Sequence, residues 1–295
     1  MSITAAQVKE LRERTNVGMM ECKRALVESN GDMDLAIEAL RKSGQAKADK
    51  KADRVAAEGI VIIRGSDDAK RAVMIEINSE TDFVARDENF MNFAEMLAKT
   101  ALQHSLTDVE ALKQVELLGA DGQTVEQARH SLVAKVGENI NIRRVVFSNT
   151  AANAVGAYQH GTRIGVVVDL DVDNIDLAKD IAMHIAASKP IVISPDEVPA
   201  DAVAKEKEIF MAQAASSGKP QDIIEKMVQG RLKKYLDEVS LTGQPFIKDP
   251  EMTVDALLAK HRAKVISFSR FEVGEGIEKV QEDFREAVMA QVNNG

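Results

Sequence analysis

The chain has 295 residues, which is enough for two or three domains with a substantial hydrophobic core. It carries 38 Lys and Arg against 47 Asp and Glu, a formal net charge of -9. This acidic balance argues against direct nucleic-acid binding, because polyanions favour a basic surface. Trp is absent and aromatic residues make up 4% of the chain, so platforms that stack on bases are not expected either.

Cys22 is the single cysteine, which excludes an intrachain disulfide and any metal site built from several cysteines. It lies in an apolar helical pattern and is predicted to be an inert core thiol in a reducing compartment. The sequence shows no signal peptide and no apolar run of membrane-spanning length. We therefore expect a cytoplasmic protein that does not bind membranes.

Three short helices are predicted within the first 43 residues. Thr4 and Gln7 form a capping-box pattern, and the helix that follows should run to about Thr15. The second helix is expected to begin at Met19, and the third is expected to stop at Ser43-Gly44. Such small helices bury little surface, so this domain should be marginally stable alone.

Two features of this region bear on its surroundings. Met19 and Met20 stand beside Gly18; core packing is the favoured interpretation, and the alternative is a docking surface, since flexible thioethers adapt to partners.

Residues 45–54 hold no apolar residue larger than Ala and have a basic excess, which is typical of a solvated linker or an exposed helix. We place the first domain boundary at residue 54.

A weak internal duplication organises the next part of the chain. Two helical patterns match at a constant offset of 84 residues, and each follows an apolar strand pattern, at 73–77 and at 164–170. The matched positions are Phe93, Ala94, Leu97, Ala98, Ala101 and Leu102 with Leu177, Ala178, Ile181, Ala182, Ile185 and Ala186. With further strand patterns at 145–147 and 191–193, this predicts two related α+β units.

The first copy has about nine residues more than the second between its strand and its helix. These include Thr81, Asp82, Phe83 and Val84, which we interpret as an irregular segment at a strand end, where proteins often place side chains meant for partners. The alternative is that Phe83 and Val84 fold back onto the core, as most Phe and Val side chains do. The residues alone leave both interpretations open.

The rest of the chain predicts a corner, a hairpin and a final strand. A helix should stop at Gly137 and leave Glu138 at an exposed corner. Two helical patterns from Pro199 to Leu236 flank a turn at residues 216–220, which predicts an antiparallel helical hairpin that either projects as an arm or covers the sheet. A strand is expected at 265–273, and Gly274-Glu275-Gly276 should open a C-terminal helix through Val288.

Catalytic and ligand-binding patterns are missing from the sequence. It contains no phosphate-binding loop, and Gly274-Glu275-Gly276-Ile277 lacks the third glycine of a dinucleotide site. The histidines are scattered without metal-ligand spacing; His184 is expected to be packed or half exposed, and His160, beside Tyr158 in a polar turn, is expected to face a partner. No pair of carboxylates stands out for acid-base work. We expect no enzyme activity, no metal and no cofactor.

Six segments carry distinctive motifs in a fixed order over essentially the whole chain. They are Thr15 to Leu26 (TNVGMMECKRAL), Asn78 to Arg86 (NSETDFVAR), Lys135 to Arg144 (KVGENINIRR), Tyr158 to Gly165 (YQHGTRIG), Ser240 to Phe246 (SLTGQPF) and Arg270 to Lys279 (RFEVGEGIEK). In these segments the chain resembles the bacterial translation elongation factor Ts family. The resemblance implies guanine-nucleotide exchange on elongation factor Tu during protein synthesis.

The resemblance also implies an α+β fold in five parts. These are an N-terminal three-helix ubiquitin-associated-like domain with a basic linker (1–54), a core subdomain with the TDFV segment (55–150), a second related α+β core subdomain (151–198 and 237–273), an antiparallel helical hairpin arm (199–236) and a C-terminal helical module (274–295).

Partner-binding residues follow from the same resemblance. In the family, the aspartate and phenylalanine of the TDFV segment enter the GTPase domain of elongation factor Tu and disturb its magnesium site. Here these are Asp82 and Phe83, flanked by Thr81 and Val84. Further contacts are implied for Val136, Gly137 and Glu138 on the GTPase domain, for His160 on another partner domain, and for the Thr15 to Leu26 segment with Val17, Gly18, Met19 and Met20.

Elongation factor Tu, GDP-bound or nucleotide-free, is therefore the expected partner. A homodimer through the hairpin arm is left open. Two other functions remain as alternatives: a protein-binding adaptor that uses the N-terminal helical domain, and a hydrolase with Asp82 or Glu80 as base, which would lack a nucleophile or a metal.

Overall fold

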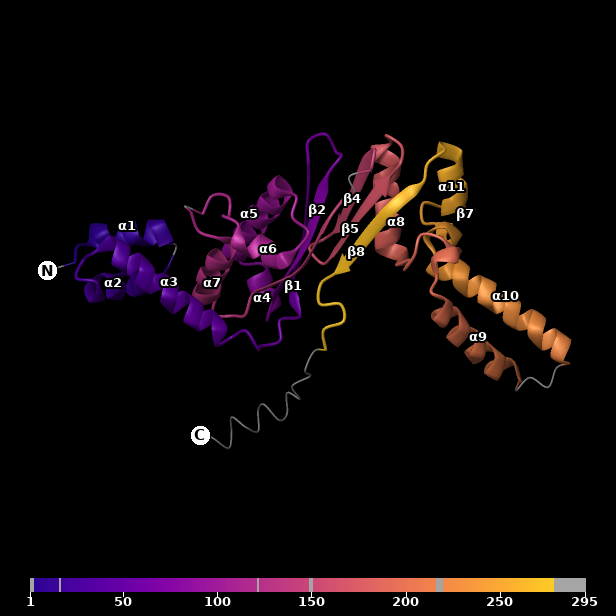
Figure 1. The fold of residues 1–295 in the computed structure, drawn as a ribbon, viewed down its shortest axis with the longest axis horizontal. Helices are drawn as coiled ribbons and strands as arrows, with labels where there is room; N and C mark the ends of the chain where they lie inside the picture. The colour runs from indigo at the N-terminus through magenta and orange to yellow at the C-terminus, as the bar shows by residue number, and fades with distance from the viewer. Residues whose placement is uncertain (1–2, 16, 121, 149–150, 216–219, 279–295) are drawn as a thin grey trace, which may run out of the picture. The chain divides into compact units, whose positions relative to one another are not determined.

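The computed structural model describes residues 3–15, 17–120, 122–148, 151–215 and 220–278. Helices and short sheets combine in one chain, which confirms the predicted α+β class (Figure 1). The chain divides into two compact units, one of residues 1–62, 75–145 and 272–295 and the other of residues 63–74 and 146–271. No helix among the described residues has both the length and the apolar character that a membrane span requires. The five domain boundaries expected from the resemblance stay predictions.

Three helices form the N-terminal region: α1 (Ala5–Thr15), α2 (Met19–Glu28) and α3 (Met33–Asp49). The capping box predicted at the start of α1 is present, since the Gln7 N–H donates to Thr4 Oγ1 at 3.3 Å and the Thr4 N–H donates to Gln7 Oε1 at 3.0 Å. Asp32 caps α3 through its Oδ1, which accepts the N–H groups of Asp34 and Leu35, both at 3.0 Å. The helices enclose a small core of Val8, Leu11, Cys22, Ala25, Leu26, Ala36 and Leu40.

The predicted end of the third helix at Ser43-Gly44 is wrong, because α3 continues to Asp49. Gly44 and Ala48 are buried where α3 packs on α7 (Val125–Val136). A Cβ at Gly44 would lie 3.7 Å from the carbonyl oxygen of His130. Ala48 belongs to the segment 45–54 that was expected to be a solvated linker or an exposed helix, and here it is buried within a helix.

The first core subdomain carries a three-stranded sheet in the order β1-β2-β3. Its elements are β1 (Glu58–Gly65), β2 (Ala72–Ser79), α4 (Asp82–Ala85), α5 (Glu88–His104), α6 (Val109–Gln114), α7 and β3 (Asn141–Phe147). Every residue of β2 is buried, as its continuous apolar pattern predicts for a central strand. Both α5 and α6 pack against α7.

The second core subdomain repeats this strand order. Its sheet runs β4-β5-β8, built from β4 (Ala154–His160), β5 (Ile164–Leu170) and β8 (Val265–Glu272). In both copies a pair of strands is followed by a helix, and a third strand then pairs with the second strand. The helix here is α8 (Ile175–Ser188), which packs on β4 so closely that a Cβ at Gly156 would lie 2.3 Å from the carbonyl oxygen of Ala178. The shared strand order supports the duplication that the offset of 84 residues indicated.

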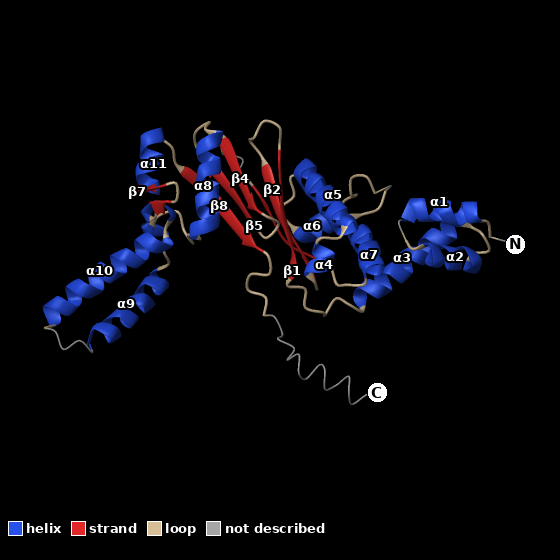
Figure 2. Cartoon of the chain, turned by 180° about the vertical axis from the view of Figure 1, so that it is seen from behind, coloured by secondary structure: helices blue, strands red, loops and turns tan. Residues whose placement is uncertain are grey.

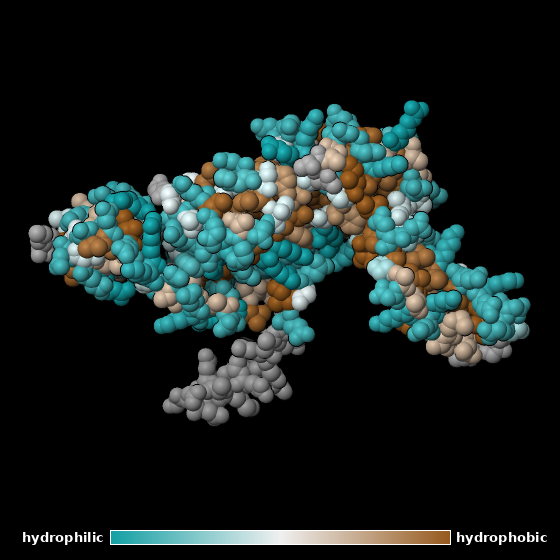
Figure 3. Space-filling view, viewed as in Figure 1, coloured by the Kyte–Doolittle hydropathy of each residue, from teal (hydrophilic) through white to brown (hydrophobic). Residues whose placement is uncertain are grey.

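A long insertion separates α8 from β8. It contains η1 (Pro195–Glu197), α9 (Ala200–Ala215), α10 (Gln221–Val239), η2 (Leu241–Gly243), β6 (Pro245–Phe246), β7 (Asp249–Thr253) and α11 (Val254–His261). As predicted, α9 and α10 pack as an antiparallel hairpin, around Ala214, Ile224 and Val228 (Figure 2). Apolar and polar side chains alternate over the face of this hairpin that Figure 3 shows. Ile209 and Ile223 are among its exposed apolar residues.

His184 joins α8 to the segment that follows the hairpin. It is fully buried, its Nδ1 accepts the Ile247 N–H at 3.2 Å, and its Nε2 lies 2.9 Å from Gln244 Oε1. Gln244 donates its own amide hydrogens to the carbonyl oxygens of Glu238 and Ser188, so its Oε1 faces the ring as an acceptor. The network therefore fixes a neutral imidazole with its proton on Nε2.

Two predicted elements differ from the structure, and parts of two others fall outside the described residues. The strand at 191–193 is only a single bridge between Val192 and Ser240. Residues 273–276 form a turn rather than the start of a helix. The remainder of the predicted C-terminal helix, and residues 216–219 of the hairpin turn, lie outside the described residues.

Candidate functional site

The segment predicted to be irregular is a single helical turn, α4 (Asp82–Ala85), that directly follows the buried strand β2. Thr81 caps the turn, and its Oγ1 accepts the Val84 N–H at 3.4 Å. The only buried residue of the turn is Ala85. A short helical turn that directly follows a central strand is held by a rigid part of the fold.

Phe83 is 81% exposed, the largest exposure among the exposed large apolar residues of the described chain. The alternative in which it folds back onto the core is therefore wrong for Phe83, whereas Val84 is half-buried. Asp82 lies beside it and its carboxylate forms an ion pair with Arg86 at 2.9 Å, one turn further on. An exposed pair of this kind contributes ~0.3 to 0.5 kcal/mol, so it restrains Asp82 only weakly.

Glu138 holds the start of this turn. Its Oε2 accepts the Thr81 N–H at 2.9 Å, and its Oε1 accepts the Thr81 hydroxyl at 2.6 Å. Glu138 was expected at an exposed corner, and this is wrong, since its carboxylate is half-buried and both oxygens face Thr81. The sequence missed the contact because 57 residues separate the two partners.

The hydrogen bonds between the two segments run in both directions. The neighbour of Thr81, Glu80, accepts the Asn139 N–H on its Oε1 at 2.6 Å, so each segment places a carboxylate on the backbone of the other. Gly137 makes the corner possible: it ends α7 in the left-handed conformation at φ 81°, where a side chain would be strained. Val136, the last residue of α7, is half-buried beside this corner.

Residues 51–54 pack onto the same corner from the other side. Lys51 Nζ donates to the carbonyl oxygen of Gly137. The amide of Asn139 donates to the carbonyl oxygens of Ala52 and Arg54 at 3.1 and 2.8 Å. Sequence analysis did not single out Lys51, Arg54 or Asn139, and it named Glu80 only as a candidate base of the alternative hydrolase. Their only signal was that Glu80 and Asn139 lie inside motif segments.

The methionines of the N-terminal region are on the surface. Met19 is 52% and Met20 is 77% exposed, so the interpretation as core residues is wrong for both. Gly18 is the exposed N-cap of α2, and Val17 is half-buried against the small helical core. Cys22, one turn later, is fully buried as predicted, and burial raises the pKa of its thiol. This end of α2 therefore combines two exposed thioethers with a well-anchored helix.

His160 belongs to the second compact unit. It is exposed at the last position of β4, opposite Ile164 in the register, rather than in a turn as expected. Its ring stacks on that of Tyr158 with the centroids 6.4 Å apart, and its Nδ1 lies 3.4 Å from the tyrosine hydroxyl. The stacking holds the imidazole at the surface.

Behind the exposed turn, β2 carries a buried carboxylate that sequence analysis did not identify. Glu76 accepts the Gly274 N–H at 2.8 Å and binds Arg143 at 3.1 Å and Arg144 at 2.6 Å. Burial by itself raises the pKa of Glu76, but the Gly274 and Asn78 hydrogen bonds and the two guanidinium groups hold it below its ordinary value. The carboxylate therefore ties residues after β8 to the strand that leads into α4.

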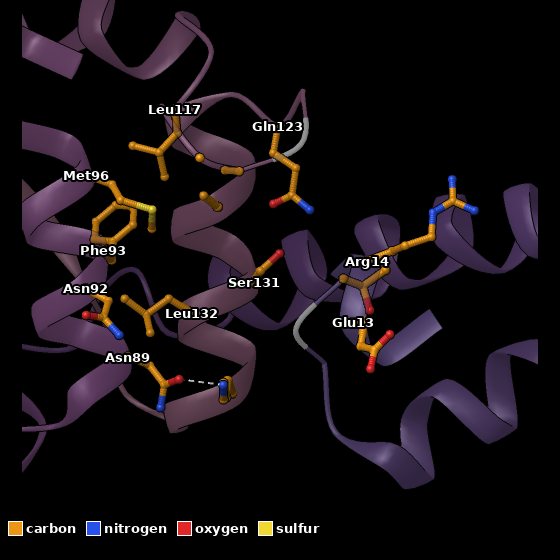
Figure 4. Close-up of a pocket in the computed structure, with 15 residues that line it drawn as sticks. Glu13, Arg14, Asn89, Asn92, Phe93, Met96, Leu117, Gln123, Ser131 and Leu132 are labelled. Atoms are coloured by element: carbon orange, nitrogen blue, oxygen red, sulfur yellow. Dashed lines mark hydrogen bonds between the residues drawn. The ribbon is translucent and has the colours of Figure 1, made fainter. Parts of the chain in front are cut away.

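A cavity of about 180 Å³ also lies in the first unit, and Figure 4 shows its lining. Phe93 and Met96 of α5 and Leu132 of α7 form an apolar wall, and Glu13 and Arg14 come from α1. Within the described residues, no group of three or more His, Cys, Asp or Glu could hold a metal ion. The cavity lining likewise contains no nucleophile paired with a base.

Comparison with known proteins places the chain in a family. The sequence profile described as Elongation factor TS matches residues 80–275. The Elongation factor Ts of Legionella pneumophila (strain Paris) is 59% identical over 291 residues, and the match covers 99% of each chain. That of Thioalkalivibrio sulfidiphilus is 58% identical and that of Methylococcus capsulatus 55% identical, with the same coverage.

The chain belongs to the elongation factor Ts family. Membership places it among the elongation factors of protein biosynthesis and confirms the resemblance carried by the six motif segments. The profile match begins at Glu80, so it includes α4, the corner at 136–138 and His160, while Val17, Gly18, Met19 and Met20 precede it.

Proposed function

We propose that this elongation factor Ts family member is a guanine-nucleotide exchange factor for elongation factor Tu. It would bind the GDP-bound protein, promote release of GDP by disturbing the magnesium and phosphate site of the GTPase domain, and hold the nucleotide-free form. The observation that carries this proposal is the exposed Phe83 on a helical turn fixed by a buried strand. No covalent bond changes in such a process, so the protein acts as a binding partner and not as an enzyme.

Phe83 supplies the wedge in this mechanism. GDP in a GTPase is held by a phosphate-cradling loop and by magnesium, whose position depends on neighbouring elements. An aromatic side chain inserted between those elements would displace them. A buried aromatic anchor of this kind commonly contributes ~2 to 4 kcal/mol to an interface. Because Phe83 contributes little to its own core, that energy is available for the partner.

Asp82 adds charge beside the wedge. Its carboxylate is half exposed and forms an ion pair with the exposed Arg86, which it can leave at small cost. A negative charge brought near a magnesium ion and an anionic nucleotide competes for the ion or repels the phosphates. Thr81 and Val84 frame the two residues and set the direction in which they point.

Further partner contacts are proposed at three places. Val136 and Gly137 present the corner next to α4, and Glu138 supports it. Met19 and Met20, with Val17 and Gly18, offer an adaptable apolar surface at the start of α2. His160 offers an exposed imidazole in the second unit. These contacts would supply binding that does not depend on the nucleotide, whereas α4 would supply the part that opposes GDP.

This division has a thermodynamic consequence. Coupling between two ligands is reciprocal, so if this protein weakens GDP binding by some factor, GDP weakens the binding of this protein by the same factor. Each tenfold effect corresponds to about 1.4 kcal/mol of coupling. Affinity measured by titration for nucleotide-free elongation factor Tu should therefore exceed that for the GDP-bound form.

The deciding experiment is the release rate of a fluorescent GDP from elongation factor Tu with a catalytic amount of this protein. The wild-type chain should accelerate release, and the double variant Asp82→Ala with Phe83→Ala should lose most of the acceleration while remaining folded. Ile191→Ala serves as the control, since Ile191 is also an exposed apolar residue but lies in the other compact unit. No acceleration by the wild type would refute the proposal.

The exposed methionines keep an adaptor function as a second candidate. In that case α2 would capture a partner without any effect on nucleotide release. The double variant Met19→Ser with Met20→Ser in the full chain separates the two functions. If the wild type does not accelerate GDP release and the variant loses binding to elongation factor Tu, the adaptor is favoured. If the variant binds elongation factor Tu more weakly but keeps the maximal exchange rate of the wild type, the first proposal is favoured. A homodimer through the hairpin arm stays open, and the cytoplasmic location stays a prediction.

A further inference from the structure

We infer that Asn139 is a positioning residue for the exchange step, because it fastens the chain segment 51–54 to the corner that holds α4. The inference rests on the proposed exchange function and extends it. The segment at the end of the N-terminal helical region would then do more than connect two parts of the chain. It would set the orientation in which Asp82 and Phe83 are presented.

Residues 51–54 are fastened to the corner by hydrogen bonds to their backbone. Asn139 is 6% exposed, and its amide nitrogen donates to the carbonyl oxygens of Ala52 and Arg54 at 3.1 and 2.8 Å. Both amide hydrogens are therefore used on one short stretch of backbone. Lys51 adds a third bond, to the carbonyl oxygen of Gly137. These bonds define the path of residues 51–54 without any apolar side chain.

The corner is bonded in turn to the start of α4. The Asn139 N–H donates to Glu80 at 2.6 Å, and the preceding residue, Glu138, accepts both hydrogen bonds of Thr81. Glu80 also lies 3.5 Å from the guanidinium of Arg54, so the segment reaches the start of α4 by a second route. Charge-assisted bonds of these lengths are among the stronger hydrogen bonds in proteins.

The corner acts on the first residues of α4, which lead directly to the exposed ring of Phe83. Within α4 Ala85 is buried, Val84 is half-buried and Phe83 is exposed. The direction of Phe83 therefore depends on how its first residues are held, and Glu80 and Thr81 are both held by the corner. Thr81 is also held by Ser79, whose Oγ donates to its carbonyl oxygen at 2.8 Å, and α4 packs on α5, so loss of the corner should shift Phe83 without releasing the turn. Misplacements of about 1 Å commonly lower rates strongly.

Asn139→Asp tests the inference with almost no change in shape. The substitution replaces the amide nitrogen, which donates both hydrogen bonds, by a carboxylate oxygen that faces the two carbonyl oxygens, so the segment should detach while the backbone bond to Glu80 can remain. Asn141→Asp is the matched control, because the same change occurs two residues later at an exposed position. Thermal unfolding of both variants shows whether they are folded.

Three readouts separate positioning from tethering. Trypsin cleavage after Lys51 and Arg54 should accelerate in Asn139→Asp, which reports detachment. The chain has no Trp, so Phe83→Trp gives a single reporter, and its fluorescence anisotropy should fall when Asn139→Asp is added. When Phe83 is left unchanged, Asn139→Asp should lower the maximal rate of GDP release about tenfold, or 1.4 kcal/mol. The concentration of this protein that gives half of the maximal rate should change little.

The outcomes distinguish the possible failures. Faster cleavage with unchanged anisotropy and unchanged exchange would overturn the inference, since the segment would then be only a tether. No change in any readout would overturn it as well. If the wild type does not accelerate GDP release, the proposed function fails, yet the anisotropy still decides whether Asn139 positions α4. If Asn139→Asp does not fold, Lys51→Met removes one surface bond and should shift anisotropy and Arg54 cleavage in the same direction.

Discussion

Glu138 accepts two hydrogen bonds from Thr81, one from its backbone N–H at 2.9 Å and one from its hydroxyl at 2.6 Å. The two residues are 57 positions apart, and together they join the end of α7 to the start of α4. A carboxylate that binds both a backbone and a side-chain donor of one residue fixes its rotation as well as its position. The exposed pair Asp82 and Phe83 follows immediately.

Thr81→Val should weaken this connection without removing it. The valine keeps the shape and the N–H but loses the hydroxyl, which both donates to Glu138 and caps α4. Loss of such a cap costs about 1 kcal/mol, so the chain should stay folded. We expect slower GDP release in the fluorescent-nucleotide assay, with Thr81→Ser close to wild type. Equal exchange rates for the valine and serine variants would show that the hydroxyl has no part in presenting α4.

Phe83 and Phe90 provide a matched pair for stability. Phe90 is fully buried on α5, whereas Phe83 is 81% exposed. Urea unfolding of Phe90→Ala should show a loss of about 3 to 5 kcal/mol, the usual cost for a buried phenylalanine. Phe83→Ala should stay within about 0.5 kcal/mol of wild type, as most surface substitutions do. A large loss for Phe83→Ala would mean that its ring packs inward in solution.

Glu76→Gln tests the buried ion cluster on β2. The amide keeps the size of the carboxylate but removes the charge that Arg143 and Arg144 share. Breaking a fully buried ion pair lowers the free energy of unfolding by about 3 to 5 kcal/mol. Both arginines are partly exposed here, so we expect a loss of about 2 kcal/mol. Urea denaturation measures it, with the exposed Glu10→Gln as the control. Hydrogen exchange at the Gly274 amide should also speed up.

His184 should make stability depend on pH in a defined window. Burial lowers its pKa, and the Gln244 hydrogen bond offsets this only in part. The unfolded chain, with a histidine pKa near 6.5, therefore binds the proton first, so stability is full above that value and decreases as the pH falls through it. One pH unit below, the loss should reach up to about 1.4 kcal/mol.

Hydrogen exchange of the Ile247 amide tests this prediction at the site itself. The Ile247 N–H donates to His184 Nδ1, which can accept it only when Nδ1 is unprotonated. Protection should decrease between pH 7 and pH 5.5 beyond the change expected from intrinsic exchange. His184→Gln should remove most of the pH dependence of thermal unfolding in this window. The lowered pKa of Glu76 acts in a separate window, since its contribution is lost only as the pH falls below the ordinary range of a glutamate. An unchanged pH profile in His184→Gln would contradict the assignment.

Patterns local in sequence predicted most of the secondary structure. The Thr4 and Gln7 capping box, the left-handed stop at Gly137 and the helical hairpin all depend on residues within one or two turns, and each is present. The errors occur where packing between distant segments decides. Gly44 suggested a helix end, yet it lies inside α3, at the place where this helix packs on α7.

The functional segment shows the same limit. Its position after a strand and its motif drew attention to Phe83, but whether the ring packs inward depended on the space left by other elements. The exposure of Met19 and Met20 could not be read from their spacing either, because a thioether suits a core and a surface equally well. The sequence did not predict the contacts of Glu80, Glu138 and Asn139; it showed only that these residues lie in motif segments.

Periodicity, turn chemistry and short motifs are enough to predict the α+β class, the duplication, the hairpin and the family, because each signal lies in residues that are close together in the chain. The burial of particular carboxylates, the contact of Glu138 with Thr81 and the path of residues 51–54 to the same corner depend on how the whole chain folds. Hydrogen bonds between segments tens of residues apart depend on where the chain brings donor and acceptor, and no local pattern records that distance.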